Sequence, residues 1–320
     1  MDENKNKINS VSIVVPVYNS ADTLEELVER LVRTLDSKIK YNIVLSVDGS
    51  PDNSYEVCCQ LVEKYPSNVC AIELMRNFGQ QNAKMAGLQY ADGDVVVFMD
   101  DDLQNPPESI FELINAIEQG NDAVYTYSGK KKQSGFKNFG SKVNDCMARF
   151  LLNKPKELQF SSYQAISRSV ADSLRKNNNP FPYPSGNILQ CTRKIAQIEV
   201  SHLPRKKGVS NYTFRKLFFL WLNGFVGFSI RPLRIASFIG FFLFIFAFIF
   251  SAYLLIHKLF YPRAILSGWT SLMLVMLMLF GFLFFILGII GEYIGRILLL
   301  LNGKPQYVVR QIKGVKVKIK

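Results

Sequence analysis

Three consecutive carboxylates, Asp100, Asp101 and Asp102, directly follow a run of apolar residues. Adjacent acids repel one another unless a cation or several hydrogen-bond donors neutralise them. In an extended segment the side chains of Asp100 and Asp102 point the same way, and that of Asp101 points the opposite way. Carboxylate oxygens are hard ligands that suit Mg²⁺ or Mn²⁺, and such an ion would bridge the phosphates of a nucleotide. The competing interpretation is a solvated acidic turn that precedes a helix.

The elements that would position these acids alternate between strand and helix. Apolar, β-branched runs predict the strands, and apolar residues at helical spacing predict the helices. The predicted strands are residues 11–17, 41–47, 69–74, 94–99 and 122–127. The predicted helices are residues 22–35, 54–64, 80–90 and 106–118, the first with Thr23 and Glu26 as a capping box. This alternation predicts an α/β fold with a mostly parallel sheet covered by helices on both faces.

Polar residues or turn formers stand at the ends of the first four predicted strands. They are Pro16, Tyr18, Asn19, Asp48, Arg76 and Asp100. The carboxyl ends of parallel strands share one edge of a sheet, and open α/β sheets bind ligands at that edge. A tight turn at Gly49 is expected to leave the Asp48 carboxylate free to accept from a base N–H or a ribose hydroxyl. Four such ends in register favour a nucleotide site over ordinary turn formers.

The sequence also disfavours several classes of protein. It contains neither Gly-x-Gly-x-x-Gly nor a Gly-Lys-Ser/Thr phosphate loop, which disfavours a dinucleotide oxidoreductase or a P-loop hydrolase. A bound diphosphate would therefore rest on the metal. The five cysteines are irregularly spaced, so they predict no metal or disulfide framework and fit a reducing compartment.

Two long apolar segments predict a membrane part. Residues 235–256 and 264–291 carry no charge, in a chain whose overall hydrophobic content is 48%. At about 1.5 Å per residue the first segment reaches about 33 Å, enough to cross a hydrocarbon core of about 30 Å. We expect transmembrane helices at 235–257 and 270–292, joined by a short extracytoplasmic loop at 258–269. Buried core helices, or one re-entrant hairpin, are the alternative.

Flanking charge predicts how these helices are oriented. Basic residues lie before the first segment and after the second, and few lie in the loop, so both ends of the chain are expected in the cytoplasm. The protein is then a multi-pass protein of the cytoplasmic membrane. Residues 1–10 lack the apolar core of a signal peptide. Residues 1–213 are then a cytoplasmic catalytic domain, 214–234 an interfacial amphipathic segment, and 293–320 a cytoplasmic basic tail. Small residues on the second helix leave a homo-oligomer open: Gly281, Gly288, Gly291 and Gly295.

The formal net charge of +12 raises the question of nucleic acid as a partner. The basic residues cluster beside the apolar segments and in the tail at 313–320. Positive charge in such places attracts anionic lipid headgroups, by about 1 kcal/mol per residue near the surface. No RNA-binding aromatic motif or DNA-reading helix pattern is present, so membrane lipids are favoured over nucleic acid as the partner.

These residues resemble the family 2 glycosyltransferases. Within that family the chain is similar to the polyprenyl-phosphate glycosyltransferases, the group of dolichyl-phosphate mannose synthase and the bacterial undecaprenyl-phosphate sugar transferases. The matching segments are residues 12–19, 47–52, 76–80 with 86–87, 99–107, 202–212 and 291–296. The resemblance implies a GT-A nucleotide-diphospho-sugar transferase domain. It also implies a nucleotide-sugar donor and a polyprenyl phosphate acceptor.

The resemblance further implies roles for individual residues. On the donor side, Asp48 would contact the base, Asp100 and Asp102 would serve as the nucleotide and metal acids, and Gln104 would support the metal. The nucleotide contacts would be completed by Pro16, Tyr18, Arg76 and Asp101. The catalytic residues would be Asp102, Lys137 and Arg205. The acceptor phosphate would be held by Lys131, Lys132, Lys137, Ser141, Arg205 and Ser210.

Two positions depart from the pattern of the family. Many relatives have two acids before the Gly-Ser turn, whereas this chain has Val47 in place of the first. The acceptor loop usually carries arginine, for which residues 130–132 and Lys137 stand in here. Lysine binds phosphate as a point charge without the bidentate fork of arginine, so the geometry around the acceptor should differ.

The expected reaction needs no general base, because a prenyl phosphate is already ionised at neutral pH. It needs positioning and relief from charge repulsion, and direct attack at the anomeric carbon would invert its configuration. Likeness to bacterial relatives favours a UDP-sugar over a GDP-sugar. Two alternatives remain. A processive family 2 polysaccharide synthase should show more spans and a Gln-x-x-Arg-Trp motif, which neither Trp221 nor Trp269 provides. A non-enzymatic membrane scaffold would leave the aligned acids unexplained.

Overall fold

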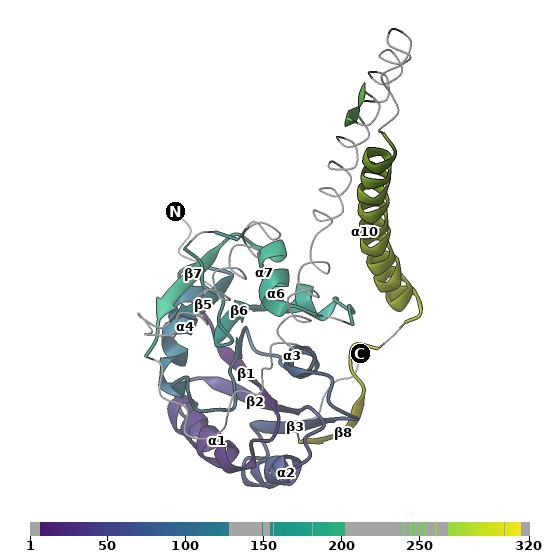
Figure 1. Cartoon of the computed structure of the whole chain (residues 1–320). Helices are drawn as coiled ribbons and strands as arrows, with labels where there is room; N and C mark the ends of the chain where they lie inside the picture. The colour runs from purple at the N-terminus through teal and green to yellow at the C-terminus, as the bar shows by residue number, and fades with distance from the viewer. Residues whose placement is uncertain are drawn as a thin grey trace. The chain divides into compact units, whose positions relative to one another are not determined.

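The structure, a computed structural model, describes the chain in segments. These are residues 7–127, 149, 154–155, 157–180, 182–201, 238, 242, 245–246, 249–250, 253, 260, 268–303 and 305–314. The chain divides into two compact units, the first Met1–Thr213 with Lys304–Lys320 and the second Phe214–Gly303. Each unit is described by itself below (Figure 1).

The first unit is built on a mixed eight-stranded sheet with the order β7-β5-β6-β4-β1-β2-β3-β8. Its centre is parallel, because β1 pairs in parallel with β2 and β4, and β2 with β3. Antiparallel pairing begins outside this centre, where β6 lies against β4 and β5, and β8 lies against β3. The strands are β1 Ser10–Val17, β2 Lys40–Val47, β3 Val69–Leu74, β4 Val95–Phe98, β5 Ala123–Tyr127, β6 Gln164–Ser167, β7 Ile195–Glu199 and β8 Val309–Gly314.

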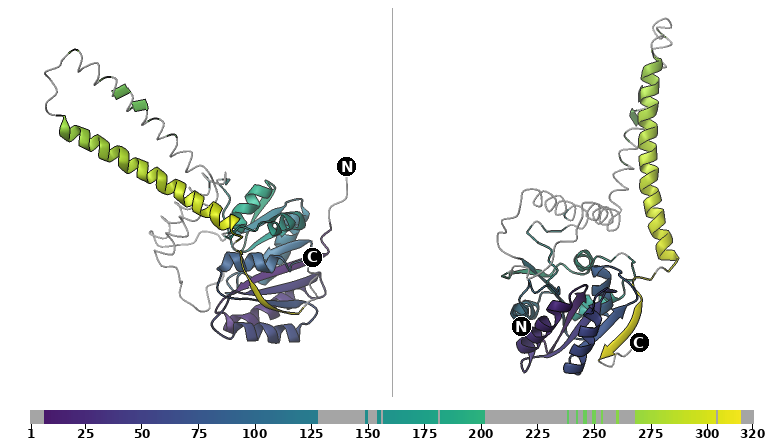
Figure 2. Two further views of the ribbon diagram at one scale, coloured as in Figure 1. Left: turned by 90° about the vertical axis from the view of Figure 1, so that its right-hand side faces the viewer. Right: turned by 60° about the horizontal axis from the view of Figure 1, so that its bottom comes forward.

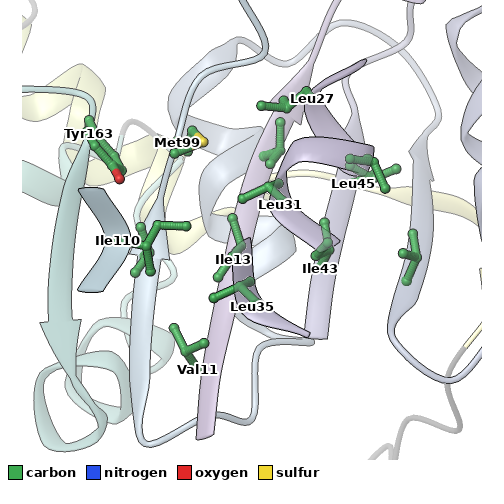
Figure 3. Packing of buried hydrophobic residues seen from close by; sticks show 14 of the residues in the cluster. Val11, Ile13, Leu27, Leu31, Leu35, Ile43, Leu45, Met99, Ile110 and Tyr163 are labelled. Carbon is green, nitrogen blue, oxygen red and sulfur yellow. The ribbon is translucent and has the colours of Figure 1, made fainter. Parts of the chain in front are cut away.

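Helices cover both faces of this sheet. Alternate residues of β1 face opposite sides, so Val11 and Ile13 join the core under α1, α2 and α4, while Val14 joins the core under α3, α6 and α7. Figure 3 shows the first core, in which Leu27, Leu31 and Leu35 of α1 lie over β1 and β2. The helices are α1 Ala21–Leu35, α2 Ser54–Lys64, α3 Gln80–Leu88, the 3₁₀ turn η1 Pro107–Ser109, α4 Ile110–Glu118, α6 Arg168–Arg175 and α7 Pro184–Cys191.

The predicted α/β fold with a mostly parallel sheet covered on both faces is confirmed. All five predicted strands and all four predicted helices form, with ends shifted by a few residues. The predicted capping box is wrong, because α1 begins at Ala21 with Ser20 as its N-cap. The Thr23 hydroxyl instead donates to the carbonyls of Ser20 and Asp101. The sequence did not predict β6, α6, α7, β7 or β8.

The strand β8 comes from the segment expected to be a basic tail. It runs antiparallel to β3 and forms an edge of the sheet, where the right-hand view of Figure 2 shows it in yellow. Met75 donates its amide hydrogen to the Val308 carbonyl (2.9 Å), and Gln311 donates to the Glu73 carboxylate (2.9 Å). Residues 309–314 therefore complete the sheet of the first unit.

In the second unit, the helix α10 spans Trp269–Leu301 and has 33 residues. It contains the segment 270–292 that the sequence predicted as a transmembrane helix, and it continues past the predicted end. Over the residues that the structure describes, no helix meets the requirements of length and hydropathy for a membrane span. The interfacial segment 214–234 and most of the predicted span 235–257 lie outside the described residues. The two membrane helices therefore stay a prediction.

Candidate active site

The carboxyl ends of four neighbouring parallel strands meet at one edge of the first unit's sheet. In the pairing register Val17 of β1 lies beside Val47 of β2, and Val47 lies beside Glu73 of β3. On the other side of β1, Val14 lies beside Phe98 of β4. The residues that follow these strands are therefore brought together, as the sequence predicted.

The Asp48 carboxylate organises the loop after β3. It is 2% exposed and accepts from the backbone amides of Phe78 (2.7 Å, Oδ1) and Gly79 (2.8 Å, Oδ2). Burial raises the pKa of this carboxyl, and the two amide hydrogen bonds oppose the rise. Each oxygen of Asp48 therefore already has one backbone partner. Its contact to a base stays a prediction that must use the remaining lone pairs.

Asp52 joins the loops after β1 and β2. Its Oδ1 accepts from the hydroxyls of Ser50 and Ser54 (both 2.6 Å), and its Oδ2 accepts from the Ala21 amide (3.3 Å). Ser50 in turn accepts from the amide of Asn19, which has a φ of 56°. Burial acts to raise the pKa of Asp52, but the hydrogen bonds outweigh it and leave the pKa lowered. The carboxylate thereby holds the start of α1 against the turn at Ser50.

The first two of the three consecutive acids, Asp100 and Asp101, point in different directions. Asp101 turns toward the start of α1, where its Oδ2 accepts from the Ser20 hydroxyl (2.5 Å) and the Tyr18 amide (3.2 Å). Burial raises the pKa of Asp101 to about 6, against the lowering effect of these two donors. Asp100 turns toward α3, where its Oδ1 accepts from the Gln80 side-chain amide (2.8 Å). Asp100 and Asp101 therefore point to opposite sides. That Asp102 points the same way as Asp100 stays a prediction.

A lysine that the sequence analysis did not single out is the second partner of Asp100. The Lys84 Nζ lies 3.2 Å from Asp100 Oδ1, with the Lys84 side chain 3% exposed and that of Asp100 18% exposed. The same Nζ donates to the Ser162 carbonyl at 3.3 Å. A signal was present, because Lys84 interrupts a run of small apolar residues on α3. Its partners, however, could not be identified from spacing.

Beyond Asp102 the chain turns sharply. Leu103 has a φ of 58° although it is 2% exposed, and the Gln104 amide donates back to Asp102 Oδ1 (3.1 Å). A left-handed conformation is strained for leucine and persists only where the surroundings fix it. The backbone at the acids is therefore held in a defined shape.

Comparisons with known proteins give this edge a context. The family described as Glycosyl transferase family 2 matches residues 12–176, which include every one of these strand ends. The chain belongs to glycosyl transferase family 2. It is therefore an enzyme, and the scaffold alternative is set aside.

Relatives of this family 2 glycosyltransferase match nearly its whole length. The undecaprenyl-phosphate 4-deoxy-4-formamido-L-arabinose transferase of Proteus mirabilis is 32% identical over 312 residues, covering 97% of this chain and 96% of the relative. An uncharacterized glycosyltransferase of Bacillus subtilis is 33% identical over 309 residues, covering 95% of this chain and 94% of the relative. The predicted likeness to polyprenyl-phosphate glycosyltransferases is confirmed.

A solved structure shares the fold. Glucosyl-3-phosphoglycerate synthase from Mycobacterium tuberculosis, in complex with Mn²⁺, uridine-diphosphate-glucose and phosphoglyceric acid, superposes with a TM-score of 0.50. It is 15% identical, and the match covers 68% of this chain and 79% of that one. At this identity the likeness shows the fold alone, which supports the GT-A-like assignment of the first unit.

The remaining donor-side residues of the glycosyltransferase lie at or beside the same edge. Tyr18 is 45% exposed, and Arg76 is exposed with its guanidinium carbon 4.7 Å from the centroid of the Phe78 ring. Pro16 is buried within β1 beside Ser46 of β2. Tyr18 and Arg76 thus have surface that a ligand can contact, while Pro16 shapes the strand behind them.

The acids suit a divalent cation that is bound jointly with a substrate. Among the described residues, no three His, Cys, Asp or Glu side chains gather into a metal-binding cluster. Mg²⁺ commonly uses one or two carboxylates together with substrate phosphates, so a protein-only cluster is not required. Both contacts that the described residues make to the Asp100 carboxylate go to Oδ1, which leaves Oδ2 for a ligand. Asp100, Asp102 and Gln104 offer only hard oxygens, and this donor set fits Mg²⁺ or Mn²⁺.

The acceptor-side residues predicted from the sequence lie outside the described part of the chain. They are Lys131, Lys132, Lys137, Ser141, Arg205 and Ser210. Their roles stay predictions.

Proposed function

We propose that this enzyme transfers a sugar from a UDP-sugar to undecaprenyl phosphate. The observation that carries the proposal is a match along 97% of the chain to an undecaprenyl-phosphate sugar transferase, in a protein whose acids gather at the ligand-binding edge of its sheet. A processive polysaccharide synthase would not account for similarity over this whole length. The product would serve cell-envelope glycan or lipid modification.

The donor would bind across the ends of β1, β2 and β4. The exposed ring of Tyr18 and the guanidinium of Arg76 offer stacking and charge to a nucleoside diphosphate. Asp100 would present Oδ2 to the ligand because Lys84 and Gln80 hold Oδ1. The Asp100 carboxylate is thus held in place before the donor arrives, which reduces the free energy needed to order the site.

A divalent cation would be held by Asp100, Asp102 and Gln104. When bound, Mg²⁺ or Mn²⁺ would neutralise negative charge on the departing nucleoside diphosphate. The protein supplies the turn at Leu103, which keeps Asp102 and Gln104 in contact through the Gln104 amide.

The acceptor would attack without a general base. Its phosphate oxygen is ionised at neutral pH and must be brought close to the anomeric carbon despite the negative charge of the donor. We assign Lys137 and Arg205 to this task, with Lys131, Lys132, Ser141 and Ser210 around the phosphate. Attack opposite the departing diphosphate would invert the configuration of the sugar.

We further propose that the enzyme works at the cytoplasmic face of the membrane through two membrane helices. The helix α10 supports this placement, because it exposes many large apolar side chains to its surroundings. They include Leu272, Val275, Met276, Leu279, Phe280, Leu283, Leu287, Ile294, Ile297 and Leu298, each at least 39% exposed. A lipid environment would bury this surface and bring the enzyme to its lipid acceptor.

The test is transfer of radiolabelled sugar to undecaprenyl phosphate by the purified full-length protein. The donor panel contains UDP-glucose, UDP-N-acetylglucosamine, UDP-4-deoxy-4-formamido-L-arabinose and GDP-mannose, each with Mg²⁺ or Mn²⁺ and with EDTA. The variant Asp102→Ala removes one proposed ligand of the metal, and Asp36→Ala, at an exposed position after α1, is the matched control.

We expect label in the lipid fraction with a UDP-sugar and a divalent cation. The label should be lost with EDTA and in Asp102→Ala, and retained in Asp36→Ala. Transfer from GDP-mannose alone would overturn the choice of UDP. Absence of transfer from every donor, together with absence of metal-dependent nucleotide binding, would overturn the proposed reaction.

A further inference from the structure

Lys84 is a buried cation at the donor end of the site. Its side chain is 3% exposed, and its Nζ lies 3.2 Å from Asp100 Oδ1 and 3.3 Å from the Ser162 carbonyl. It stands on α3 among Ala83, Met85 and other buried residues of that helix. Among the residues that the structure describes, the charge of Lys84 is therefore directed at one carboxylate, that of Asp100.

A lysine in such a place requires a physical reason. Removing an ammonium group from water is strongly unfavourable unless it is paired and hydrogen-bonded. A buried ion pair can commonly be replaced as a whole by well-packed apolar residues without loss of stability. Asp100 by contrast is partly exposed and stands first in a row of three acids. The pair therefore places a fixed positive charge 3.2 Å from the first of the three acids.

The direction of the contacts suggests what the pair does. Lys84 and the Gln80 side chain both donate to Oδ1 from the side of α3, so the Asp100 carboxylate cannot rotate without losing both. Its other oxygen is left for a ligand. An ammonium group this close to Asp100 repels a divalent cation bound to the same carboxylate and attracts a diphosphate.

We propose that Lys84 is a positioning residue for the donor, a resident cation that fixes Asp100 and balances part of the charge of the nucleoside diphosphate. This inference rests on the proposed function, because it assigns the ligand of the edge as a nucleoside diphosphate. It has a consequence that a purely structural role does not share. Lys84 opposes the binding of a metal alone and favours the binding of a nucleotide without metal.

The test compares two affinities in Lys84→Met, which keeps an unbranched side chain and removes the charge. Binding of Mn²⁺ alone is measured by electron paramagnetic resonance, and binding of UDP in EDTA by calorimetry, both on the full-length protein at one pH. Lys64→Met is the matched control, because Lys64 is 46% exposed and pairs with Glu29 on the surface. Circular dichroism confirms that each variant is folded.

We expect Lys84→Met to bind Mn²⁺ at least threefold more tightly and metal-free UDP at least threefold more weakly, with Lys64→Met unchanged in both. In an Asp100→Asn background the gain in Mn²⁺ affinity should shrink, because Lys84 acts on the metal mainly through Asp100. If Lys84→Met alone fails to fold, the inference is still tested by comparing Asp100→Asn with the double variant Lys84→Met/Asp100→Asn. Neither of these proteins leaves the Asp100 carboxylate without its lysine partner.

Opposite changes in the two affinities support the proposal. Weakening of both, or no change in either, would overturn it and leave Lys84 with a structural role only. The proposed function is tested separately by the wild-type protein. If the wild type binds UDP and the variants show the wrong pattern, only the role of Lys84 is overturned. If the wild type binds no nucleotide with or without metal, both proposals are overturned.

Discussion

Gly49 lies so close to the backbone of Arg76 that no side chain fits between them, so the turn after β2 and the loop after β3 are in contact. A Cβ at Gly49 would meet the Arg76 backbone and lie 2.5 Å from the backbone nitrogen of Asn77. Gly49 also has a φ of 57°, which glycine adopts without strain. This contact places Asp48 within reach of the amides of Phe78 and Gly79.

We predict that Gly49→Ala destabilises the first unit by about 3 kcal/mol or more, since it adds both a strained φ and a collision with backbone atoms. The control is Gly120→Ala, at a φ of 96° with nothing within 4 Å of the added Cβ. That change adds only the conformational strain, about 1 kcal/mol. Urea unfolding followed by circular dichroism measures both. Equal losses in the two variants would mean that the contact with Arg76 contributes nothing.

We predict that Asp52→Ala lowers the free energy of unfolding by about 1–3 kcal/mol at pH 7, because several donors lose their acceptor. Hydrogen bonds lower the pKa of Asp52 in the folded state despite its burial. The stabilisation is therefore present above the unfolded pKa of about 4 and is lost as the pH falls through the folded value. The difference between variant and wild type should shrink below about pH 4, as measured by urea unfolding across pH.

The exposed Asp36 provides the comparison for Asp52. Its replacement by alanine should change the free energy of unfolding by no more than about 0.5 kcal/mol at any pH in the series. A difference for Asp52→Ala that grows toward low pH would contradict the assignment of its carboxylate as the stabilising group.

The parts of the fold that the sequence predicted are those with strong local signals. The strands β1 to β4 are nearly continuous apolar runs because both faces of the sheet are covered, and α1 has a clear apolar stripe. The same runs located the strand ends and hence the acids. The predicted start of α1 at residue 22 lies one residue after the observed start at Ala21, and Ser20, not Thr23, precedes the helix.

The parts that could not be predicted depend on partners distant in sequence. The sequence of β8 predicts a charged tail, because Arg310, Gln311 and Lys313 interrupt its apolar residues. The segment forms a strand only through its pairing with β3. The engagement of Asp48 depends on a loop after another strand. The burial of Lys84 depends on Asp100 and Ser162. The spacing of apolar and polar residues within one segment does not predict contacts between segments that are distant in sequence.

We predict that Tyr307→Ala loosens β8 and costs about 2 kcal/mol, because the ring is partly buried against the second core. The Met75 amide donates to the carbonyl of Val308, which is next to Tyr307. Hydrogen exchange of this amide should therefore be faster in Tyr307→Ala than in the wild type. Lys313→Ala is the control, since it removes an exposed ion pair with Glu63 that contributes no more than about 1 kcal/mol. Unchanged exchange at Met75 in Tyr307→Ala would show that β8 is held without this ring.

We predict that Asp48→Asn lowers both the stability and the affinity for nucleotide. Asp48 receives one amide hydrogen on each oxygen, and the asparagine side chain has only one acceptor oxygen. Either Phe78 or Gly79 must then face an NH₂ group, which leaves a donor unsatisfied and costs about 1–3 kcal/mol. Loosening of the loop should also displace Arg76, so UDP binding measured by calorimetry should weaken. Each 1.4 kcal/mol of lost binding free energy corresponds to an affinity about tenfold weaker.

Asp122→Asn separates this effect from a general intolerance of asparagine. Asp122 accepts from the Thr192 hydroxyl through a single oxygen at 2.5 Å, and an amide oxygen can take over that bond. Its stability and its affinity for UDP should therefore stay close to those of the wild type. A different result would be wild-type stability together with lost nucleotide affinity in Asp48→Asn. The loop after β3 would then not need the second carboxylate oxygen, and Asp48 would act on the nucleotide directly.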